Sequence, residues 1–181
     1  LYGKYFDRDD AKLAGGADGN DGQRLGQGGF RLDFDRTNKL FTLQGDVYRT
    51  ESDITQAADI NASGANVLAR WTYRASSRSE LQVQTYYDRT HRLVPNQFEE
   101  HRDTFDIDVQ QRVSLNGRHS LGVGASYRLS ADDTARSATL AFEPADRTTH
   151  LITAFAQDEF PLTSTVMLMP GLKIERNGYT G

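Results

Sequence analysis

The feature that most constrains this chain is an alternation of apolar and polar residues that recurs along nearly its whole length. In one stretch Phe105 and Ile107 alternate with aspartates, and after an Asn-Gly turn Leu121 and Val123 resume the pattern. A period of two residues is that of a β-strand with one buried and one wet face. Helical periodicity is absent, apart from one possible turn in residues 52–62. The sequence therefore predicts an all-β fold.

About nine such segments follow one another, and several have about ten residues, the length that a tilted strand needs to cross a bilayer. We expect these strands at residues 1–6, 27–35, 39–49, 65–74, 81–88, 105–109, 121–127, 150–160 and 166–175. Short turns near 37, 77, 116 and 163 alternate with long polar stretches at 10–23, 51–64, 90–103 and 131–147. This one-sided arrangement predicts an antiparallel up-and-down meander that is part of a larger transmembrane β-barrel.

Alternation alone does not say what covers the apolar face. The mean hydropathy of -0.64 would suit a soluble protein, but a barrel exposes only alternate residues to lipid, so its average hydropathy stays low. A soluble all-β binding or structural domain of a secreted or surface protein is one alternative. A non-importing barrel of the adhesin or autotransporter type is another. Long strands and one-sided loops favour a barrel with lipid on its apolar face.

The opposite face carries too many charged and amide side chains for a dry core, so we expect it to be wet and to line a lumen. Its members are Arg31, Asp33, Asp35, Gln44, Asp46, Arg70, Arg74, Gln82, Gln84, Asp88, Asp106, Asp108, Gln110 and Arg128. Aromatic residues favour the headgroup zone of a bilayer. We expect them toward the long-loop ends of their strands, at Trp71, Tyr73, Tyr87, Phe105 and Tyr127.

The sequence contains no motif for catalysis or nucleic-acid binding. It has no cysteine, no nucleophile elbow and no phosphate-binding glycine loop, and its net charge of -4 argues against binding to phosphate backbones. We therefore predict no enzymatic activity, no catalytic residue, no cofactor and no nucleic-acid partner.

The sequence also contains no clear motif for a metal site or a ligand site. The loop at residues 15–23 resembles one calcium-binding nonapeptide, with Asp18, Asn20 and Asp21 as oxygen ligands, but such repeats work as stacked arrays and this is one copy. We expect a turn-rich loop there and no metal site. The histidines are interpreted as loop or strand-end residues: His91, His101, His119 and His150. Loop residues that a ligand could touch, with no binding site assigned to them, are Arg92, Phe98, His101 and Arg136.

The last forty or so residues combine features of a known barrel hairpin. The strand with Phe155, Gln157, Asp158, Glu159 and Phe160 is followed by a short turn, and then by the alternating residues Val166, Leu168, Gly171, Leu172 and Lys173. This segment resembles the barrel hairpin typical of TonB-dependent outer-membrane receptors. The strand-turn-strand segment at 27–49 is similar to mid-barrel segments of the same family.

The resemblance implies a barrel of about 22 strands plugged by an N-terminal domain, which imports scarce nutrients such as ferric siderophores. It implies the bacterial outer membrane as location, and outer-membrane lipid, TonB and a small-molecule ligand such as a metal chelate as partners. We find no plug in residues 1–181. We therefore expect a partial barrel domain of a larger receptor, which would contact TonB through a missing N-terminal part. Its open edges and exposed apolar band should make the fragment self-associate.

Overall fold

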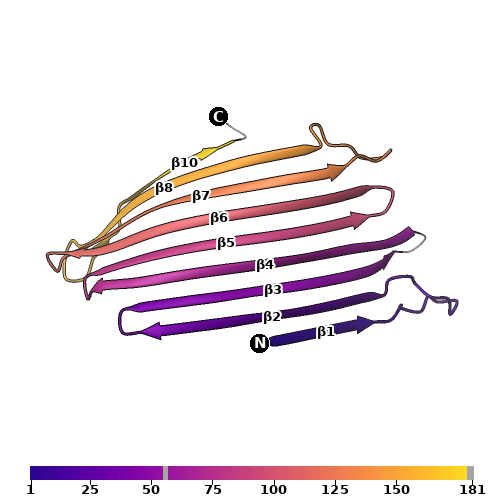
Figure 1. Cartoon of the computed structure of the whole chain (residues 1–181), viewed down its shortest axis with the longest axis horizontal. Coiled ribbons are helices and arrows are strands. Elements are labelled where there is room, and N and C mark those ends of the chain that lie inside the picture. Colours follow the sequence, from indigo (N-terminus) through magenta and orange to yellow (C-terminus); the bar gives the residue numbers. More distant parts are fainter. Residues whose placement is uncertain (55–56, 179–181) are drawn as a thin grey trace.

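The computed structural model describes residues 1–54 and 57–178, which form one antiparallel sheet (Figure 1). Its strands are β1 (Tyr2–Arg8), β2 (Gln23–Arg36), β3 (Lys39–Ile54), β4 (Ala57–Ser76), β5 (Ser79–Val94), β6 (Phe98–Leu115), β7 (His119–Ala135), β8 (Asp146–Pro161), β9 (Met167–Leu168) and β10 (Gly171–Asn177). Strands β1 to β8 lie in chain order, β10 pairs with β8, and the short β9 also pairs with β8. The predicted all-β meander is confirmed.

The last predicted strand is interrupted. Residues 166–175 were expected to form one strand, but Met169 and Pro170 separate β9 from β10. Proline has no N–H to donate to a ladder, which explains the break. The Pro170 carbonyl still accepts a hydrogen bond from the Asp158 N–H at 3.0 Å.

Two of the four predicted long loops are wrong. Strands β3 and β4 extend through most of residues 51–64, and β5 and β6 extend through most of 90–103, because backbone ladder bonds pair polar residues as readily as apolar ones. The helical turn expected in 52–62 is also wrong where the structure describes it, and residues 55 and 56 lie outside the described part. The long connections at 9–22 and 136–145 do lie at the same end of the sheet.

We call the end of the sheet with the connections at 9–22 and 136–145 the loop rim, and the opposite end the turn rim. The turn rim carries the connections at residues 37–38, 77–78, 116–118 and 162–166, on the left of Figure 1. At the Asn-Gly turn, Asn116 has φ 51° and Gly117 has φ 66°. Positive φ at two successive positions suits a tight hairpin, and Asn and Gly are the residues that adopt it most easily.

One face of the sheet is apolar from β2 to β10. Successive strand pairs place a row of cross-strand partners on it: Phe34, Phe41, Trp71, Val83, Val109, Ala125, Ala154 and Ile174. Trp71 is 36% exposed and Ile174 is 67% exposed, and no hydrophobic side chain among the described residues is buried. A soluble sandwich would cover this row with a second sheet. The described residues form one layer, which counts against the sandwich alternative.

The apolar residues of this face form a band of limited height, the apolar band. On β5 they run from Leu81 to Tyr87, and Arg89 and His91 then continue the same face toward the loop rim. On β7 the same face is apolar from Leu121 to Leu129, and this span of nine residues matches the 9–11 residues that cross a bilayer. Because β3 to β7 have 16 to 20 residues, they extend beyond the band at the loop rim.

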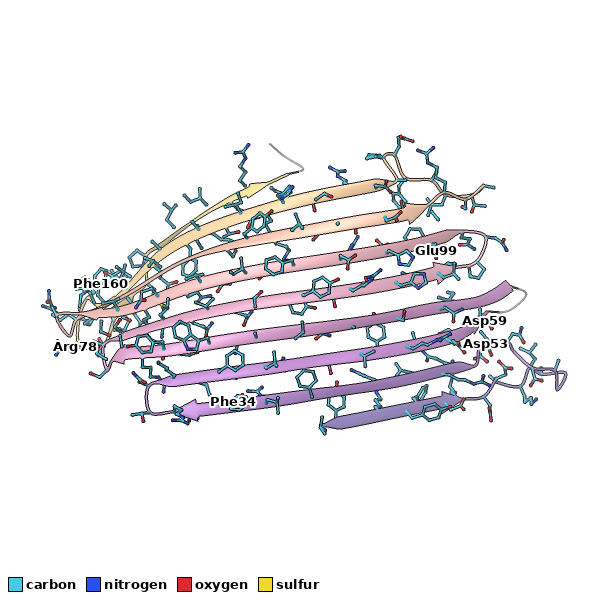
Figure 2. The ribbon with its side chains drawn as sticks, viewed as in Figure 1. Phe34, Asp53, Asp59, Arg78, Glu99 and Phe160 are labelled. Carbon is cyan, nitrogen blue, oxygen red and sulfur yellow. The ribbon has the colours of Figure 1, made fainter. Side chains whose placement is uncertain are left out.

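Aromatic residues flank the band on both sides. Tyr87, Phe105 and Tyr127 lie toward the loop rim as predicted. The prediction for Trp71 and Tyr73 is wrong, because β4 runs toward the turn at 77–78 and places them near the turn rim. Figure 2 shows Phe34 and Phe160 at that rim too. Two aromatic rows are the arrangement found at the two interfaces of membrane barrels.

No helix in the described part of the chain is both long enough and apolar enough to span a membrane.

Candidate functional site

The polar face, which lies opposite the apolar band, carries the charged and amide residues that the sequence placed together. Ion pairs link neighbouring strands on this face. Arg74 lies 2.9 Å from Glu80, and Arg128 lies 3.0 Å from Asp106, whose side chain is only 13% exposed. Each pair joins register partners, so the alternation itself brings opposite charges together. A wet, charge-paired surface of this kind suits the wall of a water-filled lumen.

Aromatic side chains on the polar face lie over glycines of the neighbouring strand. Tyr48 is the register partner of Gly64, and Phe155 is the register partner of Gly124. A Cβ added at Gly64 would lie 2.9 Å from the Tyr48 hydroxyl, which is closer than real Cβ atoms approach another group. These glycines therefore make room for large side chains on this face.

A hollow of about 350 Å³ lies on the polar face at the loop rim, where the 136–145 loop approaches β6 and β7. Arg102 lines the hollow, 2.9 Å from Glu100, and donates its Nε–H to Asp132. Phe142, from the loop, packs edge-on against Phe98 with ring centroids 5.8 Å apart. A cation between two carboxylates beside an aromatic edge offers polar and apolar contacts to a small ligand.

The loop residues that the sequence offered as possible ligand contacts are divided between the two faces. Arg92 is the register partner of Glu100 on the polar face, and Phe98 contacts Phe142 beside the hollow. Arg136 pairs with Glu143 at 2.8 Å within the loop. His101 lies on the face of the apolar band, beyond the band itself.

In the 15–23 loop, Asp18 and Asp21 were considered as calcium ligands, and both accept hydrogen bonds from nearby groups of the chain. Asp18 forms an ion pair with Lys12, and this hydrogen bond, followed by the attraction between the charges, raises the pKa of Lys12. Asp21 accepts a hydrogen bond of 2.7 Å from the Ala11 N–H. Asn20 has φ 50°, which marks a turn position. These contacts fit the predicted turn-rich loop.

Acidic residues of the 9–22 connection, β3 and β4 lie close together at the loop rim. The Asp53 N–H donates to the Gly22 carbonyl at 2.9 Å, and Asp10 accepts from the Gly22 N–H at 2.8 Å. Figure 2 shows Asp53 and Asp59 close together at the loop rim. Partial loss of hydration raises the pKa of Asp53, and repulsion from Asp59 and then Asp10 adds to the rise.

We expect Asp53→Asn to stabilise this junction near neutral pH. A carboxyl whose folded pKa is raised opposes the folded arrangement when it is ionised, so the stabilisation should fade as the pH falls through the folded pKa of Asp53. The measurement is hydrogen exchange at the Gly22 N–H, which should slow in the variant at pH 7 and match wild type in acid. Asp35→Asn, at the turn rim, is the control. Slower exchange in both variants would contradict this origin.

The four histidines lie in strands, and two of them come together. His91 and His101 are register partners on β5 and β6, and their rings stack with centroids 4.1 Å apart. The Glu99 Oε1 lies 3.0 Å from His91 Nε2 and 3.5 Å from His101 Nε2. From the sequence, we interpreted these histidines as loop or strand-end residues, because residues 90–103 were expected to be a loop.

The other two histidines have different neighbours. His119 lies 2.6 Å from Asp158 near the turn rim, and His150 accepts or donates a hydrogen bond of 2.8 Å with the Tyr127 hydroxyl. In the described part of the chain, the residues His91, Glu99 and His101 form the one group of three or more potential metal ligands. We call this group the histidine cluster.

Comparisons with known proteins give matches among solved structures. No protein-family model matches the sequence, and no curated protein matches it. The siderophore receptor PirA from Pseudomonas aeruginosa superimposes with a TM-score of 0.68 at 16% identity, over 86% of this chain and 28% of that chain. The copper transporter OprC gives 0.75 at 14% identity, over 97% and 32%. FpvAI, in its complex with pyocin S2, gives 0.69 at 11% identity, over 97% and 31%.

The chain spans about a third of the length of these solved structures. At such low identity the likeness concerns the fold alone. The fold is that of a segment of a TonB-dependent receptor barrel, as the sequence resemblance predicted.

Proposed function

We propose that this chain forms part of the barrel wall of a TonB-dependent receptor in the bacterial outer membrane. The observation that carries the proposal is the uncovered apolar row from Phe34 to Ile174, which lipid would cover over its whole width. The polar face would then line the lumen. Residues 1–181 would be a partial barrel domain of a longer receptor, whose plug would lie elsewhere in that protein.

The receptor would import a scarce nutrient such as a ferric siderophore. Two of the structural neighbours are named as a siderophore receptor and a copper transporter, so a metal or metal chelate is the substrate class that they support. The hollow around Arg102 would contact the ligand, with Phe142 packing against its apolar parts. The lining combines Arg102 and Arg147 with Glu100, Asp132 and Glu143, so polar groups of either sign on a metal chelate would find charge-assisted hydrogen bonds there.

The proposed partners follow from the edges and faces of the sheet. Outer-membrane lipid would contact the apolar band, and TonB would act through the N-terminal part of the receptor. Strands β1 and β10 have one open edge each and would pair with further barrel strands. Without those strands, the isolated chain would self-associate through the same edges. We propose no catalytic role.

The proposal is tested by uptake of ferric chelates into cells that contain the full-length receptor. Loss of the receptor should abolish growth on its chelate under iron limitation, and loss of TonB should do the same. Arg102→Ala should raise the half-saturating chelate concentration about tenfold or more, the usual cost of losing a hydrogen bond to a charged group.

Arg78→Ala is the matched control, because Arg78 lies at the turn rim (Figure 2), at the opposite end of the sheet from the residues that line the hollow. It should leave uptake unchanged. An assembled outer-membrane protein whose loss affects adhesion and leaves TonB-dependent uptake intact would instead support a non-importing barrel.

A further inference from the structure

We propose that the histidine cluster binds one divalent transition-metal ion, with Zn²⁺ the best fit. The cluster lies on the β5–β6 hairpin, on the same face as the apolar band and between that band and the loop rim. It is therefore separate from the polar face and from the hollow around Arg102. The inference goes beyond the proposed import function and does not depend on it.

The geometry already approaches that of a metal site. The potential ligand atoms of His91, Glu99 and His101 all lie within 4.8 Å of one another. Bonds of about 2.0–2.2 Å in a tetrahedral site place neighbouring ligand atoms about 3.3 Å apart. The two distances from Glu99 Oε1, at 3.0 Å and 3.5 Å, already match that spacing. Small side-chain rotations would bring the two ring nitrogens around one ion.

The backbone holds the three ligands in a fixed relation. His91 and His101 are direct register partners, and Glu99 lies two residues from His101 on the same face of β6. Ladder bonds on both sides of each strand restrain this arrangement, since β5 also pairs with β4 and β6 with β7. Because the site is built mainly from paired strands, ion binding would cost little ordering of the chain.

The donor set selects the class of ion. Two imidazole nitrogens and one carboxylate oxygen suit Zn²⁺, Cu²⁺ or Ni²⁺, whereas Mg²⁺ and Ca²⁺ prefer oxygen ligands alone. The side chains are 31%, 38% and 39% exposed in His91, Glu99 and His101, so an ion can enter from outside. Asp133 is the register partner of His101 and adds a second carboxylate to this face. Nearby negative charge favours a cation.

The test is metal binding by the full-length protein, purified in detergent without a histidine tag. Titration calorimetry with ZnCl₂ should detect one equivalent of bound Zn²⁺. His91→Ala and His101→Ala should each lower the affinity for this ion at least about tenfold, because even the loss of a residue that only orients a metal ligand has an effect of that size. Glu99→Gln should weaken the same equivalent. His119→Ala and His150→Ala are matched controls that remove a histidine elsewhere in the chain and should keep it. Excess Ca²⁺ should not compete.

A second measurement does not depend on variants. X-ray absorption of the wild-type protein loaded with one equivalent of Zn²⁺ should show scattering from two imidazole rings. If the ring nitrogens merely donate to Glu99, Zn²⁺ binding will be the same in wild type and in His91→Ala. That result, equal losses in the control variants, or a spectrum without imidazole would overturn the proposal.

Discussion

Val123→Arg is expected to destabilise the membrane-embedded barrel by about 2 to 4 kcal/mol, the cost of a cation near the middle of the hydrocarbon. Val123 lies on the face of the apolar band, on β7, between the Asn-Gly turn and Tyr127. It is 38% exposed, so a larger side chain would enter lipid without a clash. The cost is therefore that of removing the charge from water.

The loss of stability should depend on how deep the substituted residue lies in the bilayer and on which face of the sheet carries it. Ile107→Arg lies closer to the aromatic row at Phe105, where the guanidinium can reach the headgroups, so its cost should fall toward about 1 kcal/mol. Gln110→Arg is the control, because Gln110 lies on the polar face beside Asp108. Denaturant midpoints of the full-length receptor in lipid vesicles measure all three. An equal cost for Val123 and Gln110 would contradict the assignment of the faces.

The faces of the sheet could be predicted from the sequence because the side-chain period of a strand is two. Once Phe105 and Ile107 are placed on one face, Asp106 and Asp108 must lie on the other, and the register with β7 confirms it. No long-range information is needed for this step. The polar face, including the Asp106–Arg128 pair, therefore follows from local pattern alone.

The ends of the strands could not be predicted, because alternation disappears where both faces are wet. In residues 90–103 polar side chains lie on both faces, yet backbone hydrogen bonds continue the ladder from His91 opposite His101 to Val94 opposite Phe98. A pattern of apolar residues indicates which face of a strand is buried. It does not indicate strand segments that are polar on both faces. The pattern therefore predicts too short a length for strands that project beyond the membrane.

The histidine cluster was missed for the same reason, although its spacing held a signal. His91 and His101 are equidistant from Asn96, which has φ 61° at the centre of the β5–β6 turn. Residues equidistant from the centre of a hairpin are register partners if the strands extend that far. The sequence contains Pro95-Asn96 as a turn signal, so a hairpin at this position would have paired the two histidines.

The hollow around Arg102 has no comparable signal in the sequence. Phe142 contacts Phe98 from a loop that lies far along the chain, and Arg102 lies between carboxylates of β6 and β7. The path of the 136–145 loop decides these contacts, and it follows from tertiary packing. Sequence pattern predicts that such a loop exists and is exposed, which is as far as local physics reaches.

Gly124→Val is expected to destabilise the sheet by about 1 to 3 kcal/mol, the usual cost of forcing a larger group into an occupied space. A Cβ at Gly124 would overlap the Phe155 ring, whose Cζ would lie 2.8 Å away, and would approach the Val109 carbonyl oxygen to 3.0 Å. The ring can rotate, but the carbonyl belongs to the backbone of β6 and cannot move without disturbing the ladder.

Gly122→Val separates this clash from the general effect of replacing a glycine. Gly122 lies on the same strand and face, and the nearest atom to its added Cβ would be the Gln157 carbonyl oxygen at 4.0 Å. A β-branched residue there should leave stability unchanged or raise it slightly, because it favours extended backbone. Adding Phe155→Ala to Gly124→Val should recover part of the loss, and a double-mutant cycle of denaturant midpoints measures the coupling. Similar losses at both glycines, with no coupling to Phe155, would mean that the ring does not occupy the space above Gly124.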